Sequence, residues 1–199
     1  MRATQEALWK QVEFKGDKVV SYPSELEWVG QGRSAVVFRI PQSDRVVKIF
    51  YPQFHALARI EADVYRKLAN HDLFPELFEA GDGYLVMEYI EGVTLYDCLV
   101  QGIPITEEMI HGVDEALDFA RRKGLNPSDT HLKNIILTSD QNIKVIDVVR
   151  FTQEEECPHW EDLKKAYFKY YQRSYFPKKY PKFFVELIIR LYRRRWLPI

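Results

Sequence analysis

The stretch from residue 126 to residue 138 reads NPSDTHLKNIILT, and it places Asp129 and Asn134 in one polar segment ahead of an apolar run. A second run, IKVIDVVRF at 143–151, carries the lone carboxylate Asp147. The two runs predict a hairpin of two short strands joined by a polar turn. Because Asp, Asn and Pro are common turn residues, a plain turn between a helix and the first strand would explain the polar segment.

The same polar side chains also have the chemistry of a metal and proton-transfer site. Magnesium prefers hard oxygen ligands and is usually held by one or two carboxylates together with substrate phosphates, and Asn134 and Asp147 could supply such oxygens. Asp129, which has no basic neighbour in the sequence, could accept a proton from a hydroxyl group. His131, taken alone, is more simply a surface histidine in a turn. The remaining sequence has to decide between the two interpretations.

Before this segment, the sequence predicts mainly strands. Gly16 and Asp17 between alternating residues predict a hairpin, and a strand, a glycine turn and another strand follow over 26–40. The short β-branched run at 44–51 carries Lys48. Residues 54–70 change to helical spacing, with Asn70 as the expected end. The expected apolar face of this helix comprises Leu57, Ile60 or Glu61, Val64 and Leu68. Strands return on both sides of Gly81–Gly83.

The second half predicts mainly helices. Thr106 is expected to cap a helix that stops at Gly124. The tail from 160 to 196 predicts one or two helices interrupted by Pro177 and Pro181. Its apolar residues at helical spacing, which we expect to pack on the rest of the chain, are Phe184, Leu187, Ile188 and Leu191.

A β-rich part followed by a helical part predicts an α+β fold. The length of 199 residues and the hydrophobic fraction of 46% suit one domain, or one domain built as two lobes around a cleft. We expect a β-rich N-terminal lobe over residues 1–90 and a helical C-terminal lobe over residues 91–199.

Two features of the first half have both a plain and a functional interpretation. Gly30 and Gly32 predict a hairpin turn, and they would also let backbone N–H groups approach a phosphate closely. Lys48 lies in an apolar strand, where lysine is uncommon unless it is paired. Glu61 on the following helix is a candidate partner, whereas a lysine on an edge strand could instead extend to solvent.

The order of these features resembles the protein-kinase-like superfamily. GQGRSAVVF resembles its glycine-rich loop, VVKIF its lysine strand and ARIEADVYRKL its αC helix. YLVMEYIEG resembles its hinge, SDTHLKN its catalytic loop and VIDVV its metal-binding aspartate. The likeness runs from Trp28 to Phe151 with all six motifs in order.

The resemblance implies an ATP- and magnesium-dependent phosphotransferase of the serine/threonine protein kinase type. The positions that it implies for the nucleotide are Gly30, Gly32, Ala35, Val37, Met87, Glu88 and Ile90. The catalytic positions that it implies are Asp129, Lys48, Glu61 and His131. Magnesium would be held by Asn134 and Asp147.

Several departures from the superfamily pattern indicate a reduced kinase. Pro127 and Ser128 replace the His-Arg pair that precedes the catalytic aspartate, so a phosphorylated activation loop lacks its usual docking partner. His131 stands where most kinases have lysine. About 50 residues follow Asp147 and they contain no Ala-Pro-Glu segment. This abbreviation resembles the RIO kinases and the small kinase of the KEOPS complex, and it predicts a minimal catalytic core.

Two other functions are compatible with the motifs. A small-molecule kinase of the sugar or aminoglycoside type shares the D-x-H-x-x-N loop, but such enzymes usually carry a longer helical insert. A pseudokinase scaffold would keep the fold without turnover. All five charged or amide residues of the motif set are present, which argues against a degenerate site.

Composition excludes some partners and leaves one open. A net charge of −1 gives no general attraction to nucleic acid. Two distant cysteines predict neither a zinc site nor a disulfide framework. No signal core or apolar span is present, so we expect a cytoplasmic protein. From Lys164 onward, 11 Lys and Arg residues face one acidic residue, Glu186. This basic tail suggests either a solvated helix surface or an anionic partner: acidic protein, nucleic acid or membrane.

Overall fold

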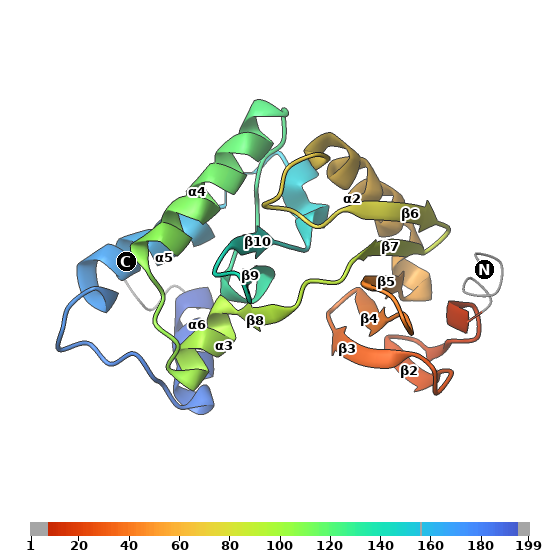
Figure 1. The fold of residues 1–199 in the computed structure, drawn as a ribbon, viewed down its shortest axis with the longest axis horizontal. Helices are drawn as coiled ribbons and strands as arrows, with labels where there is room; N and C mark the ends of the chain where they lie inside the picture. The colour runs from red at the N-terminus through yellow and green to blue at the C-terminus, as the bar shows by residue number, and fades with distance from the viewer. Residues whose placement is uncertain (1–7, 156, 195–199) are drawn as a thin grey trace. The chain divides into compact units, whose positions relative to one another are not determined.

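The computed structural model describes residues 8–155 and 157–194 (Figure 1). The chain divides into two compact units, Met1–Ile90 and Glu91–Ile199. The first is built around a sheet and the second contains most of the helices (Figure 1). The predicted α+β fold, with a β-rich N-terminal part and a smaller helical part, is confirmed.

The first unit contains a five-stranded antiparallel sheet with the order β3-β4-β5-β7-β6. Its strands are β3 (Glu27–Gln31), β4 (Ala35–Arg39), β5 (Arg45–Phe50), β6 (Leu77–Gly81) and β7 (Tyr84–Glu88). The predicted hairpin at Gly16 forms a separate two-stranded sheet from β1 (Glu13–Lys15) and β2 (Lys18–Ser21). A short 3-10 helix, η1 (Pro52–Phe54), leads into α2 (His55–Leu68).

One face of the five-stranded sheet carries the apolar core of this unit. Every second residue of β4 and β5 points to this face, including the fully buried Phe38 and Val47. The residues that cover it come from outside the sheet: Trp9, Val12 and Leu26 are all buried in the same cluster. The opposite face is therefore left for α2 and for the side chains of the alternate positions.

Helix α2 buries a polar residue at the centre of its packed face. Val64 and Leu68 are buried as predicted, and Leu57 is half-buried. Of the two candidates left open, Glu61 is the residue that points inward, whereas Ile60 is exposed. The α-helix ends at Leu68, two residues before the predicted Asn70.

The second unit begins with a three-stranded sheet of order β10-β9-β8, built from β8 (Gly92–Thr94), β9 (Ile135–Thr138) and β10 (Ile143–Val145). The β9–β10 pair is the predicted hairpin. Its helices are α3 (Leu95–Gln101), α4 (Glu107–Arg122), α5 (His159–Ala166) and α6 (Lys182–Arg193). Thr106 caps α4 through its hydroxyl oxygen, which accepts from the Met109 backbone N–H, as its position predicted.

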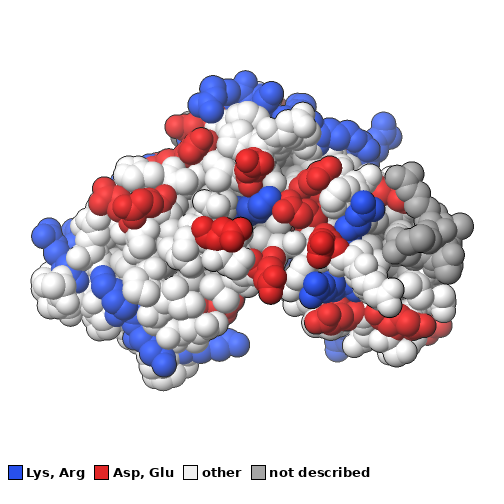
Figure 2. Space-filling model, viewed as in Figure 1, with Lys and Arg blue, Asp and Glu red and all other residues white. Residues whose placement is uncertain are grey.

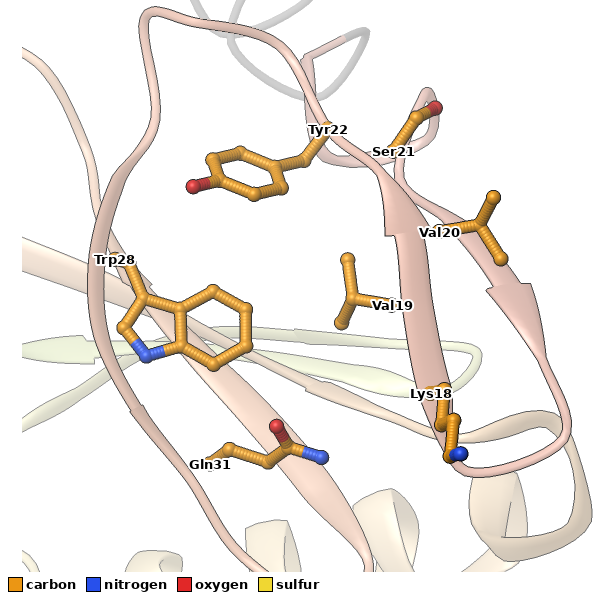
Figure 3. A pocket seen from close by; sticks show the side chains of 7 residues that line it. All are labelled: Lys18, Val19, Val20, Ser21, Tyr22, Trp28 and Gln31. Carbon is orange, nitrogen blue, oxygen red and sulfur yellow. The ribbon is translucent and has the colours of Figure 1, made fainter.

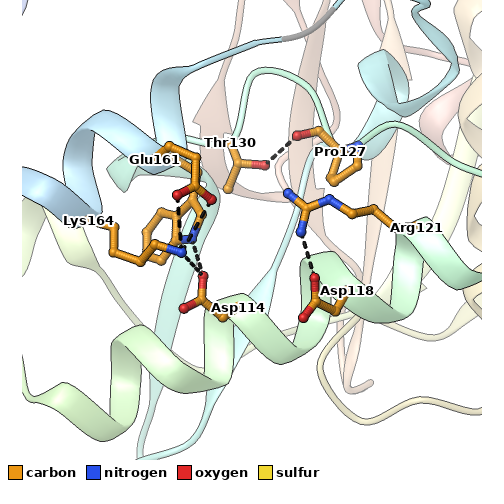
Figure 4. Close-up of polar contacts among 8 residues, drawn as sticks. Asp114, Asp118, Arg121, Pro127, Thr130, Glu161 and Lys164 are labelled. Atoms are coloured by element: carbon orange, nitrogen blue, oxygen red, sulfur yellow. Dashed lines mark hydrogen bonds and ion pairs between the residues drawn. The ribbon is translucent and has the colours of Figure 1, made fainter.

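Helix α5 is held on α4 by a buried tryptophan and an ion pair (Figure 4). Trp160 Nε1 donates to Asp114 Oδ1 at 2.7 Å, and Lys164 Nζ donates to the same oxygen at 2.9 Å. A π-helical turn, η4 (Tyr167–Tyr171), continues α5. These contacts position the start of α5, where His159 lies.

The predicted inner face of the last helix is wrong. Of the four predicted residues, Phe184, Leu187 and Ile188 are exposed and Leu191 is half-buried, whereas Val185 is buried. The side chains of Ile189 and Tyr192, four and seven residues after Val185, are half-buried. Helix α6 has apolar residues around most of its circumference, so the spacing alone did not show which side packs. The predicted end at 196 lies outside the described residues.

Candidate functional site

Strand register places most of the predicted nucleotide positions on one face of the five-stranded sheet. Val37 is paired with Gly30 on one side and with Lys48 on the other. Directly opposite residues of antiparallel strands point to the same face. Ala35, two residues before Val37, and Met87, paired with Val46, fall on this face as well. It is the face opposite the apolar core.

The glycine turn between β3 and β4 is open on its surface. Gly32 N–H donates to the Ala35 carbonyl at 2.8 Å, which closes the turn. Neither Gly30 nor Gly32 has a positive φ. A Cβ atom on Gly30 would meet nothing within 4 Å, and one on Gly32 would meet only the Ala35 carbonyl at 3.8 Å. The fold itself therefore does not require glycine at either position.

Lys48 and Glu61 form a buried ion pair between β5 and α2. Lys48 Nζ lies 2.8 Å from Oε1 and 2.7 Å from Oε2 of Glu61, so both carboxylate oxygens are engaged. The Glu61 side chain is fully buried and that of Lys48 is 12% exposed. Of the two interpretations of Lys48, the structure shows the pair and not a lysine extended to solvent.

The end of β7 and the two residues after it contain the remaining predicted nucleotide positions. Met87 is buried on β7. The Glu88 backbone N–H donates to the Glu76 carbonyl, and the Glu88 carboxylate accepts from the Glu76 backbone N–H. Glu88 therefore fixes the chain next to Ile90, the last residue of the first unit. Both Glu88 and Ile90 are half-buried.

In the second unit, hairpin register brings together the residues quoted at the outset. Ile135 is paired with Val145, and the Asn134 carbonyl next to this pair accepts from the Ile146 backbone N–H at 2.8 Å. Asp147 follows immediately. The Asn134 side chain points back toward residue 129, because its Nδ2 donates to the Asp129 carbonyl at 3.2 Å. Asp129, Asn134 and Asp147 thus lie around one end of the hairpin.

Asp129 is held in a left-handed backbone conformation, with φ of 60°, between two basic side chains. Arg150 Nε lies 3.3 Å from its Oδ2, and His159 Nδ1 lies 3.4 Å from its Oδ1. The histidine contact is long for a hydrogen bond. Together the contact with His159 and the charge of Arg150 hold the pKa of Asp129 below its ordinary value, although partial burial opposes them.

His131 is the fourth polar residue of the segment, and it is half-buried at the start of the 3-10 helix η2 (Leu132–Asn134). Burial lowers the pKa of His131, while the charges of Asp129 and Asp147 oppose that shift. The lowered pKa favours the neutral imidazole at neutral pH. His131 therefore brings a hydrogen-bonding group to the segment without a permanent positive charge.

Comparison with proteins that have assigned names shows which family this chain belongs to. The chain is 47% identical over 182 residues to the Bacillus subtilis protein named "Putative serine/threonine-protein kinase YrzF", and the match spans 90% of this chain and 85% of that protein. The chain belongs to the protein-kinase-like superfamily. A shorter match of 108 residues covers 48% of this chain. It shows 32% identity to a probable serine/threonine-protein kinase of Streptomyces coelicolor and covers 16% of that protein. PknB of Mycobacterium tuberculosis is 31% identical over 17% of its length. No family model matches the chain.

The donor set of this kinase-like chain fits magnesium better than a transition metal. No group of three or more His, Cys, Asp and Glu side chains that could hold a metal is found among the described residues. Asn134 uses its Nδ2 toward Asp129, which directs the amide oxygen away from that bond, and Asp147 adds an exposed carboxylate. One amide and one carboxylate oxygen suit an ion that takes its other ligands from phosphates and water.

A hollow on the surface of the first unit lies away from these positions (Figure 3). It has a volume of about 450 Å³ and lies between β2 and β3, where Tyr22 and Trp28 face Val19 (Figure 3). Gln31, between the two glycines of the turn, reaches its edge. None of the predicted nucleotide, catalytic or metal positions lines this hollow.

The sequence did not reveal the two basic side chains at Asp129. Arg150 and His159 are 21 and 30 positions further along the chain, and neither belongs to a motif of the superfamily that we matched. Asn126 and Ser128 bring the intervening segment close, because their side chains donate to backbone carbonyls at Gln153 and Glu155. The only local feature of the sequence that pointed to this contact was the pair of polar residues on either side of Pro127, Asn126 and Ser128.

Proposed function

We propose that this chain is an ATP- and magnesium-dependent kinase that phosphorylates serine or threonine hydroxyl groups of proteins. The observation that carries the proposal is the buried pair between Lys48 and Glu61, on the sheet face that also bears the glycine turn. Stability alone does not explain a buried ion pair, because apolar residues of similar volume often stabilise a fold equally well or better. The kinase names of the relatives point the same way.

On this proposal, the first unit binds the nucleotide. Glu61 holds the Lys48 ammonium group in place, and the ammonium group contacts the α- and β-phosphates. Gly30 and Gly32 let the backbone of the turn cover the phosphates, which explains two glycines that neither φ nor packing requires. Met87, Glu88 and Ile90 border the adenine, with Ala35 and Val37 beneath it on the same sheet face as Lys48.

The second unit handles the acceptor. Asp129 accepts the proton of the attacking hydroxyl while the oxygen of that hydroxyl forms a bond to the γ-phosphorus. The bond from the γ-phosphorus to the bridging oxygen breaks, and ADP leaves with the electron pair. Arg150 and His159 keep the Asp129 carboxylate ionised and oriented. The charges of Asp129 and Asp147 both act on the pKa of His131, and the neutral imidazole can donate one hydrogen bond.

Asn134 and Asp147 would hold magnesium, which when bound neutralises the charge of the phosphates during transfer. We also infer that the chain is a minimal kinase core. The likeness to the RIO kinases and the kinase of the KEOPS complex stays a prediction from the catalytic loop and the missing Ala-Pro-Glu segment.

The test is phosphotransfer by the purified chain with γ-labelled ATP and magnesium. We expect label in protein, either in the chain itself or in added acceptor proteins, on serine or threonine. Asp129→Asn should abolish transfer, and Asp140→Asn in the exposed hairpin turn is the matched control that should not. Label that accumulates only in a small molecule would refute the protein-kinase proposal. ATP binding without any transfer, by a folded chain, would refute catalysis.

A further inference from the structure

Helix α6 packs on its unit through a narrow inner face. Val185 is buried there. Glu186 Oε1 accepts from the Tyr96 hydroxyl at 2.7 Å and from Lys133 Nζ at 3.0 Å, which ties the helix to α3 and to the residue before Asn134. These contacts fix the orientation of α6 and leave its opposite side outward.

The outward side of α6 is apolar. Phe183 is 74% exposed, Leu187 45%, Ile188 40% and Phe184 39%. Positions 183, 184, 187 and 188 are related by steps of one, three, four and five residues, which group them on one side of a helix. We call Phe183, Phe184, Leu187 and Ile188 the outer α6 face. Isolated exposed apolar residues are ordinary, but four on one short helix form a continuous patch.

Basic side chains border the outer α6 face. Lys182 precedes it, and Arg190 and Arg194 lie three and seven residues after Leu187, beside the apolar stripe; all three are exposed. The only acidic residue of α6 is Glu186, whose carboxylate is paired with Lys133 and is 42% exposed. Figure 2 shows Lys and Arg side chains along the part of the surface where Figure 1 places α6.

We propose that the outer α6 face binds the surface of a membrane that contains anionic lipids. An amphipathic helix with aromatic and aliphatic residues on one side and Lys or Arg at its border lies in the headgroup region, where apolar burial and charge attraction act together. The 12 residues of α6 extend about 18 Å. No helix among the described residues is long and apolar enough to cross a membrane, so the helix would lie along the surface.

Charge and side-chain chemistry weigh against a second copy of the chain and against nucleic acid as the binding partner. A second copy of the chain would set Lys182, Arg190 and Arg194 against the same basic residues, which repel one another. Nucleic acid would match the charge, and Phe183 could stack on a base, but the aliphatic side chains of Leu187 and Ile188 would gain no burial from stacking. An anionic lipid surface satisfies both the apolar residues and their basic border.

Binding in this way requires no rearrangement of the catalytic loop. The contacts of Glu186 with Tyr96 and Lys133 do not involve the residues of the outer α6 face and remain in place. The inference is independent of the proposed kinase activity, because it concerns only this surface. Phosphotransfer in solution should therefore be the same with and without substitutions on the outer α6 face.

The test is flotation of the full chain with lipid vesicles. We expect the chain to float with vesicles of phosphatidylcholine mixed with phosphatidylglycerol, to remain below with phosphatidylcholine alone, and to be released as salt is raised. Leu187→Asp and the pair Arg190→Glu with Arg194→Glu should each reduce the bound fraction about tenfold or more. The matched controls, exposed residues of the first unit, are Val20→Asp and Lys67→Glu, which should bind as the unchanged chain does.

Three results would overturn the proposal. One is the absence of flotation with mixed vesicles at low salt. The second is equal flotation of the Leu187→Asp variant, which would leave the outer α6 face without a role. The third is a dimer in light scattering that Leu187→Asp converts to a monomer while vesicle binding is unaffected, because the face would then join two copies. Circular dichroism of each variant is the check that separates loss of binding from loss of structure.

Discussion

His159 Nδ1 lies 3.4 Å from Asp129 Oδ1, although 30 positions of the chain separate the two residues. The contact joins the start of α5 to the segment that carries the candidate proton acceptor. With Arg150 on the other carboxylate oxygen, it places two basic side chains at an aspartate whose motif lacks the usual preceding arginine. Arg150 and His159 thus bring basic side chains to Asp129 from later positions in the chain, and the catalytic loop itself has no arginine there.

His159→Phe should shift the acid limb of kcat/KM to higher pH. The substitution keeps an aromatic ring beside Tyr192, 5.7 Å away in the native chain, but removes the imidazole from Asp129. Because His159 and Arg150 lower the pKa of Asp129, losing one of them raises it, and protonation then begins at higher pH. His111→Phe, at an exposed histidine of α4, is the control. An unchanged limb would mean that His159 has no influence on this carboxylate.

The free energy of unfolding should also decrease in acid, because Asp129 becomes protonated there. The pKa of Asp129 is depressed in the folded chain, so its contribution to the free energy of unfolding is complete above the unfolded pKa of about 3.9 and is lost as pH falls below it. Asp129→Asn should flatten that part of the stability profile. Urea unfolding at several acid pH values measures the difference, and parallel profiles for both chains would contradict this account.

Lys48→Met should lower both activity and stability. It leaves the fully buried Glu61 carboxylate without its partner, and breaking a buried pair in this way typically costs about 3–5 kcal/mol. The double variant Lys48→Met with Glu61→Met should recover most of that loss but none of the phosphotransfer. Arg66→Ala breaks an exposed pair with Asp63 on the same helix, and should cost less than about 1 kcal/mol. Urea unfolding and labelled ATP separate the two effects.

Gly30→Ala should separate function from folding. No atom lies within 4 Å of the added Cβ, so the free energy of unfolding should stay the same or rise by up to about 1 kcal/mol. If the turn covers the phosphates, KM for ATP should rise about tenfold. Gly83→Ala is the contrasting variant, because φ there is +77° and the new Cβ would lie 2.7 Å from the His55 ring. It should lose about 1–2 kcal/mol of stability.

Asp147→Asn should abolish transfer while the chain stays folded. Asp147 is exposed and has φ of 59°, a conformation that asparagine also adopts, so the substitution removes the carboxylate charge without straining the backbone. Asn134→Ala should raise the magnesium concentration needed for half-maximal rate by about tenfold. Titration of the rate with magnesium tests both, and full activity of Asp147→Asn would remove this carboxylate from the mechanism.

The sequence by itself determined the features that depend on nearby residues. Alternation gave the hairpins β1–β2 and β9–β10, and Thr106 and the helical spacing gave α4, because turn geometry, caps and periodicity act over a few residues. The candidate partner of Lys48 was also evident, since a buried charge needs an opposite one and Glu61 lies on the next helix.

Only the tertiary structure decided which surfaces meet. It placed Trp9 over the sheet face opposite Lys48, set Arg150 and His159 at Asp129, and turned Val185 of α6 inward in place of Leu187. An amphipathic pattern states which residues share a face, not what covers it. That choice depends on the total apolar area buried and on charges that meet across distant parts of the chain, neither of which any short window of sequence contains.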